Sequence, residues 1–285
     1  MAAERPDEAR DGVDPRNRLN ELTGREWTYA LRSVISTRYP TRGPESYAHE
    51  LRRIHPSPKP PQLLAELVRF FTRRDGRVLD PFAGVGGTLI ACSLEGRSAV
   101  GVDLSPTYAA TYAAVCERLG IEPQTYVVGD ARELASFAPV QAGGFDLILT
   151  DPPYAAMMAR EKTGEQKKRG RGAATPFTSS PDDLGNLGYW EFLEELRAVL
   201  AGALSFLKPR GHLVLFTKDL QPTAEHHNML HADITVALRT IPGLEYRGYR
   251  IWHDQSQNLY PFGYPFAFVA NQVHQFILIF RYMPG

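Results

Sequence analysis

The chain has 285 residues, of which 43% are hydrophobic and 22% charged, a composition typical of a soluble globular protein that argues against wholesale disorder. Its 32 Lys and Arg residues balance its 32 Asp and Glu residues, so a polyanionic partner would require a local concentration of basic residues. Two cysteines are too few for a disulfide framework or a zinc cluster, and they predict a cytoplasmic protein. No apolar run approaches the ~18 residues of a membrane span, and the charged N-terminus is unlike a secretory signal.

The first stretch of the chain, residues 1–20, is polar and predicts a disordered tail, with residues 21–285 forming a single domain. Residues 27–39 are apolar and aromatic enough to pack on that domain. Four prolines between residues 56 and 61 prevent a helix, which begins only near Gln62, where apolar residues follow a helical period.

From residue 77 onward, short apolar segments alternate with helical patterns. We expect helices over 88–95, 106–119, 189–207 and 232–241, and strands over 77–80, 98–103, 125–130, 145–154, 212–216, 244–253 and 274–282. Strands that alternate with helices form a doubly wound, mostly parallel α/β sheet, here with seven strands. The last two strands have no long helical pattern between them, so one of them can run antiparallel.

Three of the expected strands end in an acid: Asp80, Asp103 and Asp130. Ligands of open α/β sheets bind at the carboxyl ends of the strands. After the first acid, the turn DPFAGVGG allows the backbone to approach a ligand closely, but it lacks both the dinucleotide spacing and the Gly-Lys-Ser/Thr of a phosphate loop. The pattern indicates a site for a nucleoside without a pyrophosphate, and the alternative is a tight turn without a ligand.

The fourth strand runs into DPPY at residues 151–154. Two prolines remove two backbone donors, so the turn presents carbonyl oxygens and the Asp151 carboxylate beside the aromatic Tyr154. An exocyclic amine of a nucleobase has two N–H donors and a π face that match this arrangement. Acceptors on the amine would stabilise the positive charge that develops on nitrogen when the amine attacks as a nucleophile. A rigid turn with a packed tyrosine is the alternative.

In combination, DPFAGVGGTLIACSLEGRSAVGVDLS and DPPY resemble S-adenosylmethionine-dependent methyltransferases of exocyclic amino groups, in particular the adenine-N6 and cytosine-N4 DNA methyltransferases. HPSPKPPQLL is similar to that family's cofactor-side segment, and residues 248–282 are similar to its closing hairpin. The resemblance covers residues 27–282. It implies a Rossmann-like methyltransferase fold with an antiparallel closing strand, S-adenosylmethionine as the cofactor and DNA with a flipped target base as the substrate.

The resemblance also implies a role for each matching residue. Lys59 would cover the methionine carboxylate of the cofactor, Asp103 would hold the ribose and Asp130 the adenine amino group. The residues implied to bind the cofactor are Lys59, Asp80, Pro81, Phe82, Ala83, Gly84, Gly86, Thr88, Asp103, Leu104, Asp130 and Ala131. Those implied to hold the target base are Asp151, Pro152, Pro153 and Tyr154.

DNA contacts are expected in the 155–188 and 217–233 loops. Residues 160–172 contain six basic and two acidic side chains in a glycine-rich stretch, directly after the catalytic turn. We expect this stretch to be disordered without DNA and to contact phosphates without reading bases. The DNA-binding candidates are Lys162, Lys167, Lys168, Arg169 and Arg171.

Asp as the first residue of DPPY favours adenine N6 over cytosine N4. The alternatives are an RNA methyltransferase that acts on guanine N2 and a non-catalytic nucleic-acid-binding subunit. A restriction enzyme is a possible partner in the same system, and the oligomeric state stays open.

Two other groups of residues receive structural interpretations. His226, His227, His231 and Asp233 are expected at a solvated helix start, with no metal, because no surrounding ligand framework is present. The alternating aromatic residues between 260 and 268 are expected to pack in the core or a lid, with base stacking as the alternative.

Overall fold

The part of the chain that the structure describes folds around one sheet of eight strands. A computed structural model describes residues 12–154, 180–222 and 226–285. The strands are β1 (Val34–Thr37), β2 (Arg77–Asp80), β3 (Ser98–Asp103), β4 (Thr125–Val128), β5 (Phe145–Thr150), β6 (Leu207–Thr217), β7 (Leu244–Asp254) and β8 (His274–Tyr282), in the order β1-β7-β8-β6-β5-β2-β3-β4. Only the pairs that include β8 are antiparallel. The mostly parallel sheet with an antiparallel closing strand is therefore confirmed.

The expected number of seven strands is wrong by one. The additional strand, β1, has four residues and pairs in parallel with β7 through Ile35 and Trp252, among others. So short a segment between irregular regions shows no clear alternation of apolar and polar residues, and its pairing partner lies more than 200 residues further along the chain. Its strand conformation therefore depends on tertiary contacts.

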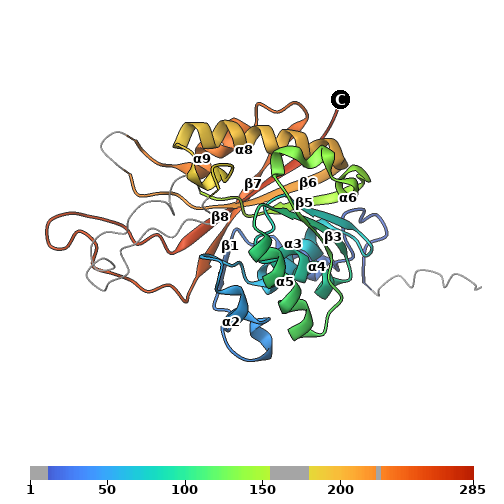
Figure 1. Cartoon of the computed structure of the whole chain (residues 1–285), viewed down its shortest axis with the longest axis horizontal. Coiled ribbons are helices and arrows are strands. Elements are labelled where there is room, and N and C mark those ends of the chain that lie inside the picture. Colours follow the sequence, from blue (N-terminus) through green and yellow to red (C-terminus); the bar gives the residue numbers. More distant parts are fainter. Residues whose placement is uncertain (1–11, 155–179, 223–225) are drawn as a thin grey trace, which may run out of the picture.

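Helices cover both faces of the sheet. One face carries α3 (Pro61–Phe71), α4 (Gly87–Glu95) and α5 (Pro106–Leu119), and the other carries α6 (Ala138–Gln141), α8 (Tyr189–Ala203) and α9 (Leu230–Leu238) (Figure 1). Two buried hydrophobic clusters, one on each face, hold these helices to the sheet. Two short helices, α1 (Gly24–Ala30) and α2 (His49–Arg52), precede α3.

Local sequence explains where the main helices begin. Helix α3 starts at Pro61, which needs no backbone donor at that position, and apolar residues then fill its buried face. Helix α5 starts after Ser105, whose side chain accepts a hydrogen bond from the Tyr108 N–H at 3.3 Å. Helix α5 begins three residues after β3 ends, so it packs back onto the sheet.

The disordered tail that the sequence predicts over residues 1–20 does not extend to Asn20 in the structure. Residues 1–11 lie outside the described residues, but Asn20 is fully buried and its side chain donates to the Phe70 carbonyl at 2.6 Å. Leu22, two residues further, belongs to the hydrophobic cluster around α3. The segment just before α1 is therefore part of the domain. In the described parts of the chain, no helix is both long and apolar enough to cross a membrane.

Candidate active site at the carboxyl edge of the sheet

The acids at the ends of β2, β3 and β4 lie at one edge, because these strands are parallel neighbours. A pocket at this edge joins Asp103 and Asp130 to Asp151, which follows β5. Its lining residues are His55, Pro81, Phe82, Asp103, Leu104, Tyr108, Gly129, Asp130, Ala131, Asp151, Pro153, Asp183 and Leu184. The pocket thus brings together eight of the residues that the sequence singled out for cofactor and base. A larger hollow, lined partly by Arg73, Arg74 and Lys208, lies at the opposite edge, away from these carboxylates.

The glycine turn after β2 is held in place by its neighbours. Gly84 donates its N–H to Asp103 Oδ2 at 2.8 Å, and its carbonyl accepts from the Tyr126 hydroxyl at 2.7 Å. Gly86 has a φ of +77°, and a Cβ there would lie 2.1 Å from the Tyr112 ring. Only glycine fits this position, both by conformation and by space. The turn places Pro81 and Phe82 at the pocket, and a close approach of Gly84 and Gly86 to a ligand stays a prediction.

Asp80 lies beneath the pocket and does not line it. Its carboxylate accepts from the Thr150 hydroxyl at 2.8 Å and from the Phe82 N–H at 3.1 Å. Burial raises the pKa of Asp80 to about 7, although the Thr88 and Thr150 hydroxyls oppose the rise. Asp80 and Thr88 therefore support the turn from below, and their direct contact with a cofactor stays a prediction.

Asp103 both supports the turn and faces the pocket. Its two oxygens accept from the N–H groups of Gly84 and Ser105, at 2.8 and 2.9 Å. Burial raises the pKa of Asp103 to about 6. Each carboxylate oxygen can accept a second hydrogen bond, so the side chain can still bind ribose hydroxyls.

The carboxylate of Asp130 is hydrogen-bonded to Arg132. Both its oxygens are within 3.1 Å of Arg132 Nε, and its Oδ1 also accepts from the Arg132 N–H at 2.9 Å. The same arginine donates to the Asp182 carbonyl at 2.7 Å and so ties β4 to the segment before α8. The expected bond from Asp130 to an adenine amino group would have to share the carboxylate with this guanidinium.

The Asp-Pro-Pro-Tyr turn contains a buried charge pair that the sequence did not indicate. Lys59 Nζ donates to Asp151 Oδ2 and lies 3.2 Å from the Tyr154 hydroxyl. Tyr154 in turn donates to Asp151 Oδ1 at 2.5 Å and lies 3.3 Å from Gln275 Oε1 on β8. The side chain of Lys59 is 4% exposed and that of Asp151 is 19% exposed. The ammonium also lies 5.6 and 5.5 Å from the ring centres of Tyr154 and Phe216.

A second buried cation fixes the backbone of Lys59. Arg52, 1% exposed, donates to the Lys59 carbonyl at 2.9 Å, the Tyr47 carbonyl at 3.0 Å and the Ser46 carbonyl at 3.3 Å. Burial lowers the pKa of Arg52 to about 10. Arg52 therefore holds the proline-rich segment against the pocket and directs Lys59 toward Asp151.

Sequence reasoning missed five residues of the pocket lining: His55, Tyr108, Gly129, Asp183 and Leu184. The rings of His55 and Tyr108 lie 5.1 Å apart, and burial lowers the pKa of His55 to about 3, so this imidazole is neutral at physiological pH. His55 is the first residue of the HPSPKPP segment, and its place in that segment is the one feature of the sequence that could have indicated it as a pocket residue. Asp183 and Leu184 follow a long connection, and no local pattern marks them.

The DNA-binding candidates Lys162, Lys167, Lys168, Arg169 and Arg171 lie outside the described residues, so phosphate contact stays a prediction.

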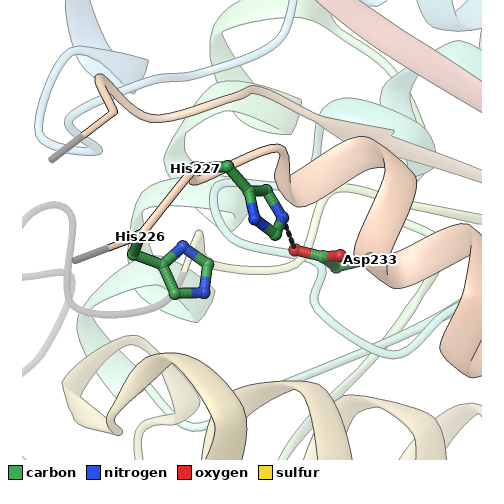
Figure 2. A group of neighbouring side chains, drawn as sticks. All are labelled: His226, His227 and Asp233. Carbon is green, nitrogen blue, oxygen red and sulfur yellow. Dashed lines mark hydrogen bonds and ion pairs between the residues drawn. The ribbon is translucent and has the colours of Figure 1, made fainter. Parts of the chain in front are cut away.

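The histidine group near α9 is compact (Figure 2). Possible ligand atoms of His226, His227 and Asp233 lie within 4.8 Å of one another. Asp233 accepts from the Tyr189 hydroxyl at 2.6 Å and lies 2.9 Å from His227 Nε2. Hydrogen bonds therefore account for the grouping, and the expected absence of a metal stays a prediction.

The late aromatic residues do not pack in the core. Phe266 and Phe268 are 93% and 94% exposed, and Tyr264 is also largely exposed. The expectation of core packing is therefore wrong for these three residues.

Two family models and one solved structure match parts of this chain. Residues 5–114 match the family model of DNA methylases, and residues 66–169 match a family described as conserved hypothetical protein 95. TrmN from Thermus thermophilus shares the fold, with a TM-score of 0.53 at 20% identity over 84% of this chain and 53% of that one.

Curated relatives cover the same region. The tRNA (guanine(10)-N2)-dimethyltransferase of Pyrococcus abyssi is 29% identical over 150 residues, 53% of this chain and 38% of the relative. The protein of the same name from Methanothermobacter thermautotrophicus is 33% identical over 118 residues, 40% of this chain and 34% of the relative. The chain therefore matches less than half the length of these relatives. The matches therefore show a methyltransferase fold and a similarity to the DNA methylase family over residues 5–114.

Proposed function

We propose that this methyltransferase modifies an exocyclic amine of a nucleobase within a polynucleotide. The observation that carries the proposal is the position of the Lys59 ammonium. That nitrogen donates to Asp151, lies 3.2 Å from the Tyr154 hydroxyl, and sits near two aromatic rings. An amine with N–H donors and an attached π system would find the same acceptors and the same aromatic surroundings.

The pocket fits the cofactor. The carboxylate of Asp103 can accept from ribose hydroxyls, while Phe82, Leu104 and Tyr108 offer apolar surface for an adenine ring. S-adenosylmethionine supplies an electrophilic methyl group when it is bound. Asp151, at the end of β5, borders this pocket and is therefore next to the place where methyl transfer occurs.

Asp151 acts by charge stabilisation in this proposal. The lone pair of an aromatic amine is delocalised into the ring, so the amine is a weak nucleophile. A carboxylate and the Pro152 carbonyl that accept from its hydrogens favour the positive charge that develops on nitrogen. As the nitrogen gains the methyl carbon, that carbon would lose its bond to the sulfur of the cofactor, and the surplus proton would then pass from the nitrogen to solvent water.

Lys59 has to move away from Asp151 before methyl transfer, because its ammonium competes with the target amine for the carboxylate and a cation disfavours a second positive charge nearby. The carboxylate of the cofactor offers an alternative partner for the ammonium. Movement of Lys59 between these two carboxylates would make base binding depend on cofactor binding.

Guanine N2 in RNA is the first substrate to test. The supporting observation is that two relatives, 29% and 33% identical over parts of this chain, are named tRNA (guanine(10)-N2)-dimethyltransferases. The amine of adenine or cytosine in DNA is the second candidate, and the match of residues 5–114 to the DNA methylase family favours it.

The experiment measures transfer of a labelled methyl group from S-adenosylmethionine to bulk tRNA, single-stranded DNA and duplex DNA. Digestion of the products to nucleosides and mass spectrometry then distinguish N2-methylguanine, N6-methyladenine and N4-methylcytosine. The Asp151→Asn variant should lose activity on the true substrate. Glu245→Gln is the matched control, because it removes the charge of an exposed carboxylate that pairs with Arg247. Methylation of none of the three polynucleotides by the wild-type protein would overturn the proposal.

A further inference from the structure

The connection between β7 and β8, residues 255–273, projects from the edge of the sheet that carries the site (Figure 1). His253 at the end of β7 pairs with His274 at the start of β8, and Phe276 on β8 pairs with Thr217 at the end of β6. Since β5 and β6 are parallel, Asp151 leaves the sheet at this same edge. We call residues 255–273 the aromatic connection.

The aromatic connection exposes large apolar side chains. Soluble proteins bury most of their phenylalanine, so a cluster of exposed rings indicates a binding surface. The exposed side chains are Leu259, Phe262, Tyr264, Phe266 and Phe268, of which the last two are almost fully exposed.

Hydrogen bonds hold the base of the aromatic connection in one conformation. The Asn271 side chain donates to the Tyr260 carbonyl and accepts from the Tyr260 N–H, both at 2.8 Å. Gln221, which follows β6, donates to the Ala270 carbonyl at 2.7 Å, and Gln272 donates to the Leu220 carbonyl at 3.3 Å. The rings therefore project from an anchored support.

A groove of about 390 Å³ lies between this support and the segment after β6. Amide side chains form much of its lining, with two aromatic rings, two aliphatic side chains, a lysine and a carboxylate: Lys218, Asp219, Leu220, Gln221, Gln257, Asn258, Tyr260, Phe262, Asn271, Gln272 and Val273. Amides both donate and accept, as base edges do, and the volume lies within the range of small-ligand sites.

The groove adjoins the catalytic turn. Lys218 borders the groove. Burial lowers the pKa of the Lys218 ammonium, and the positive charge of Lys59 lowers it further. Gln275, two residues after the groove residue Val273, lies 3.3 Å from the Tyr154 hydroxyl. A polynucleotide whose target base reaches Asp151 would thus pass next to the groove and the exposed rings.

We propose that the aromatic connection binds unpaired bases that neighbour the target base, with its exposed rings stacking on them and the amide-lined groove receiving a base edge. The inference rests on the proposed function and adds a second contact region for the same polynucleotide. Stacking tolerates any base, because every base has a π face. Aromatic rings beside amides and a lysine suit bases joined by phosphates better than they suit a purely apolar partner.

The test compares Phe266→Ala/Phe268→Ala with Phe266→Trp/Phe268→Trp, which keeps aromatic surface. Anisotropy measures the affinity of each variant for fluorescein-labelled single-stranded RNA and DNA of about 12 nucleotides, and methyl-transfer assays give KM for the polynucleotide that the wild-type protein methylates. The alanine variant should bind ~10- to 100-fold more weakly and raise KM correspondingly, whereas the tryptophan variant should stay within a few-fold of wild type. Tyr29→Ala, which removes an exposed ring on α1, is the matched control and should change neither quantity.

The outcomes separate this inference from the proposed function. Equal affinity and KM for the wild type and the alanine variant would overturn the inference and leave the proposed function standing. Methylation of free nucleosides only would overturn both the inference and the proposed function.

Sedimentation velocity of the wild type and the alanine variant tests self-association through this surface. A wild-type dimer that the alanine variant dissociates, with unchanged polynucleotide affinity, would replace the inference by an interface between copies of the chain.

Discussion

The glycine turn over residues 80–88 and the Asp-Pro-Pro-Tyr turn follow adjacent strands, β2 and β5, yet different contacts hold them in place. The glycine turn is supported by carboxylates at or next to its own sheet edge, Asp80 and Asp103, which accept from its backbone. The Asp-Pro-Pro-Tyr turn depends on side chains from distant parts of the chain, Lys59 and Gln275. In the proposed function, the cofactor side is therefore held by contacts between neighbouring strand ends, whereas the base side contains a charge pair that another donor could open.

The largest effect is expected from loss of Lys59. Lys59→Met leaves the Asp151 carboxylate, 19% exposed, without its cation, which should lower the free energy of unfolding by ~3 kcal/mol. Lys59→Met/Asp151→Asn removes both charges and should recover most of that loss. Urea unfolding followed by circular dichroism measures both variants.

The matched control for this variant is Lys208→Met, which breaks the exposed pair between Lys208 and Asp146, an ion pair of 2.7 Å. Exposed pairs contribute only ~0–1 kcal/mol. If Lys59→Met and Lys208→Met have equal effects, the base side does not depend on a buried charge pair.

A slightly smaller effect, on rate, is expected at Asp151. Asp151→Ala should lower the methyl-transfer rate by ~10²-fold or more, because the amine loses a charged acceptor as positive charge develops on it. The affinity for S-adenosylmethionine should change little, since the glycine turn and Asp103 remain in place. Calorimetry and single-turnover kinetics measure the two quantities, and near-wild-type turnover would remove Asp151 from the reaction.

This contrast between the two turns also separates what the sequence could predict from what it could not. Asp80, Asp103 and the glycines lie within 24 residues of one another, and strand ends in a parallel sheet bring such residues together. Most strand and helix positions followed from periodicity, and β8 was predicted over the residues that form it. Local patterns therefore sufficed for the fold class and for the gathering of acids at one edge of the sheet.

The contacts of the base side could not be predicted, because they join distant residues. Lys59 and Asp151 are 92 residues apart, and Tyr154 and Gln275 are 121 residues apart. Phe266 and Phe268 were expected to be buried because aromatic residues usually are, and their exposure depends on where the hairpin projects. Side-chain pairing across the fold is a property of tertiary structure that neither spacing nor composition encodes.

A moderate effect is expected on the cofactor side. Asp103→Ala should weaken S-adenosylmethionine binding by ~1–3 kcal/mol, because a charged acceptor for hydroxyl groups is lost from a partly buried site. The Gly84 N–H also loses its acceptor, so part of the effect is a looser turn. Calorimetry at pH 8 provides the dissociation constant. An unchanged value would mean that the ribose binds elsewhere.

The smallest effect is expected from the protonation of Asp80. Its pKa is about 7 in the folded protein, against 3.8 as the ordinary value, because the carboxylate is buried. Between these values the folded state binds more protons than the unfolded state, so stability contributed by this group falls as pH rises from about 4 to about 7. Asp80→Asn keeps the side chain uncharged and removes this dependence. Between pH 5 and pH 8 the melting temperature of the wild type should fall by a few degrees relative to that of the variant. Parallel melting curves across this range would show that Asp80 keeps the same charge throughout, and that the glycine turn is supported by a carboxylate ionised at every pH tested.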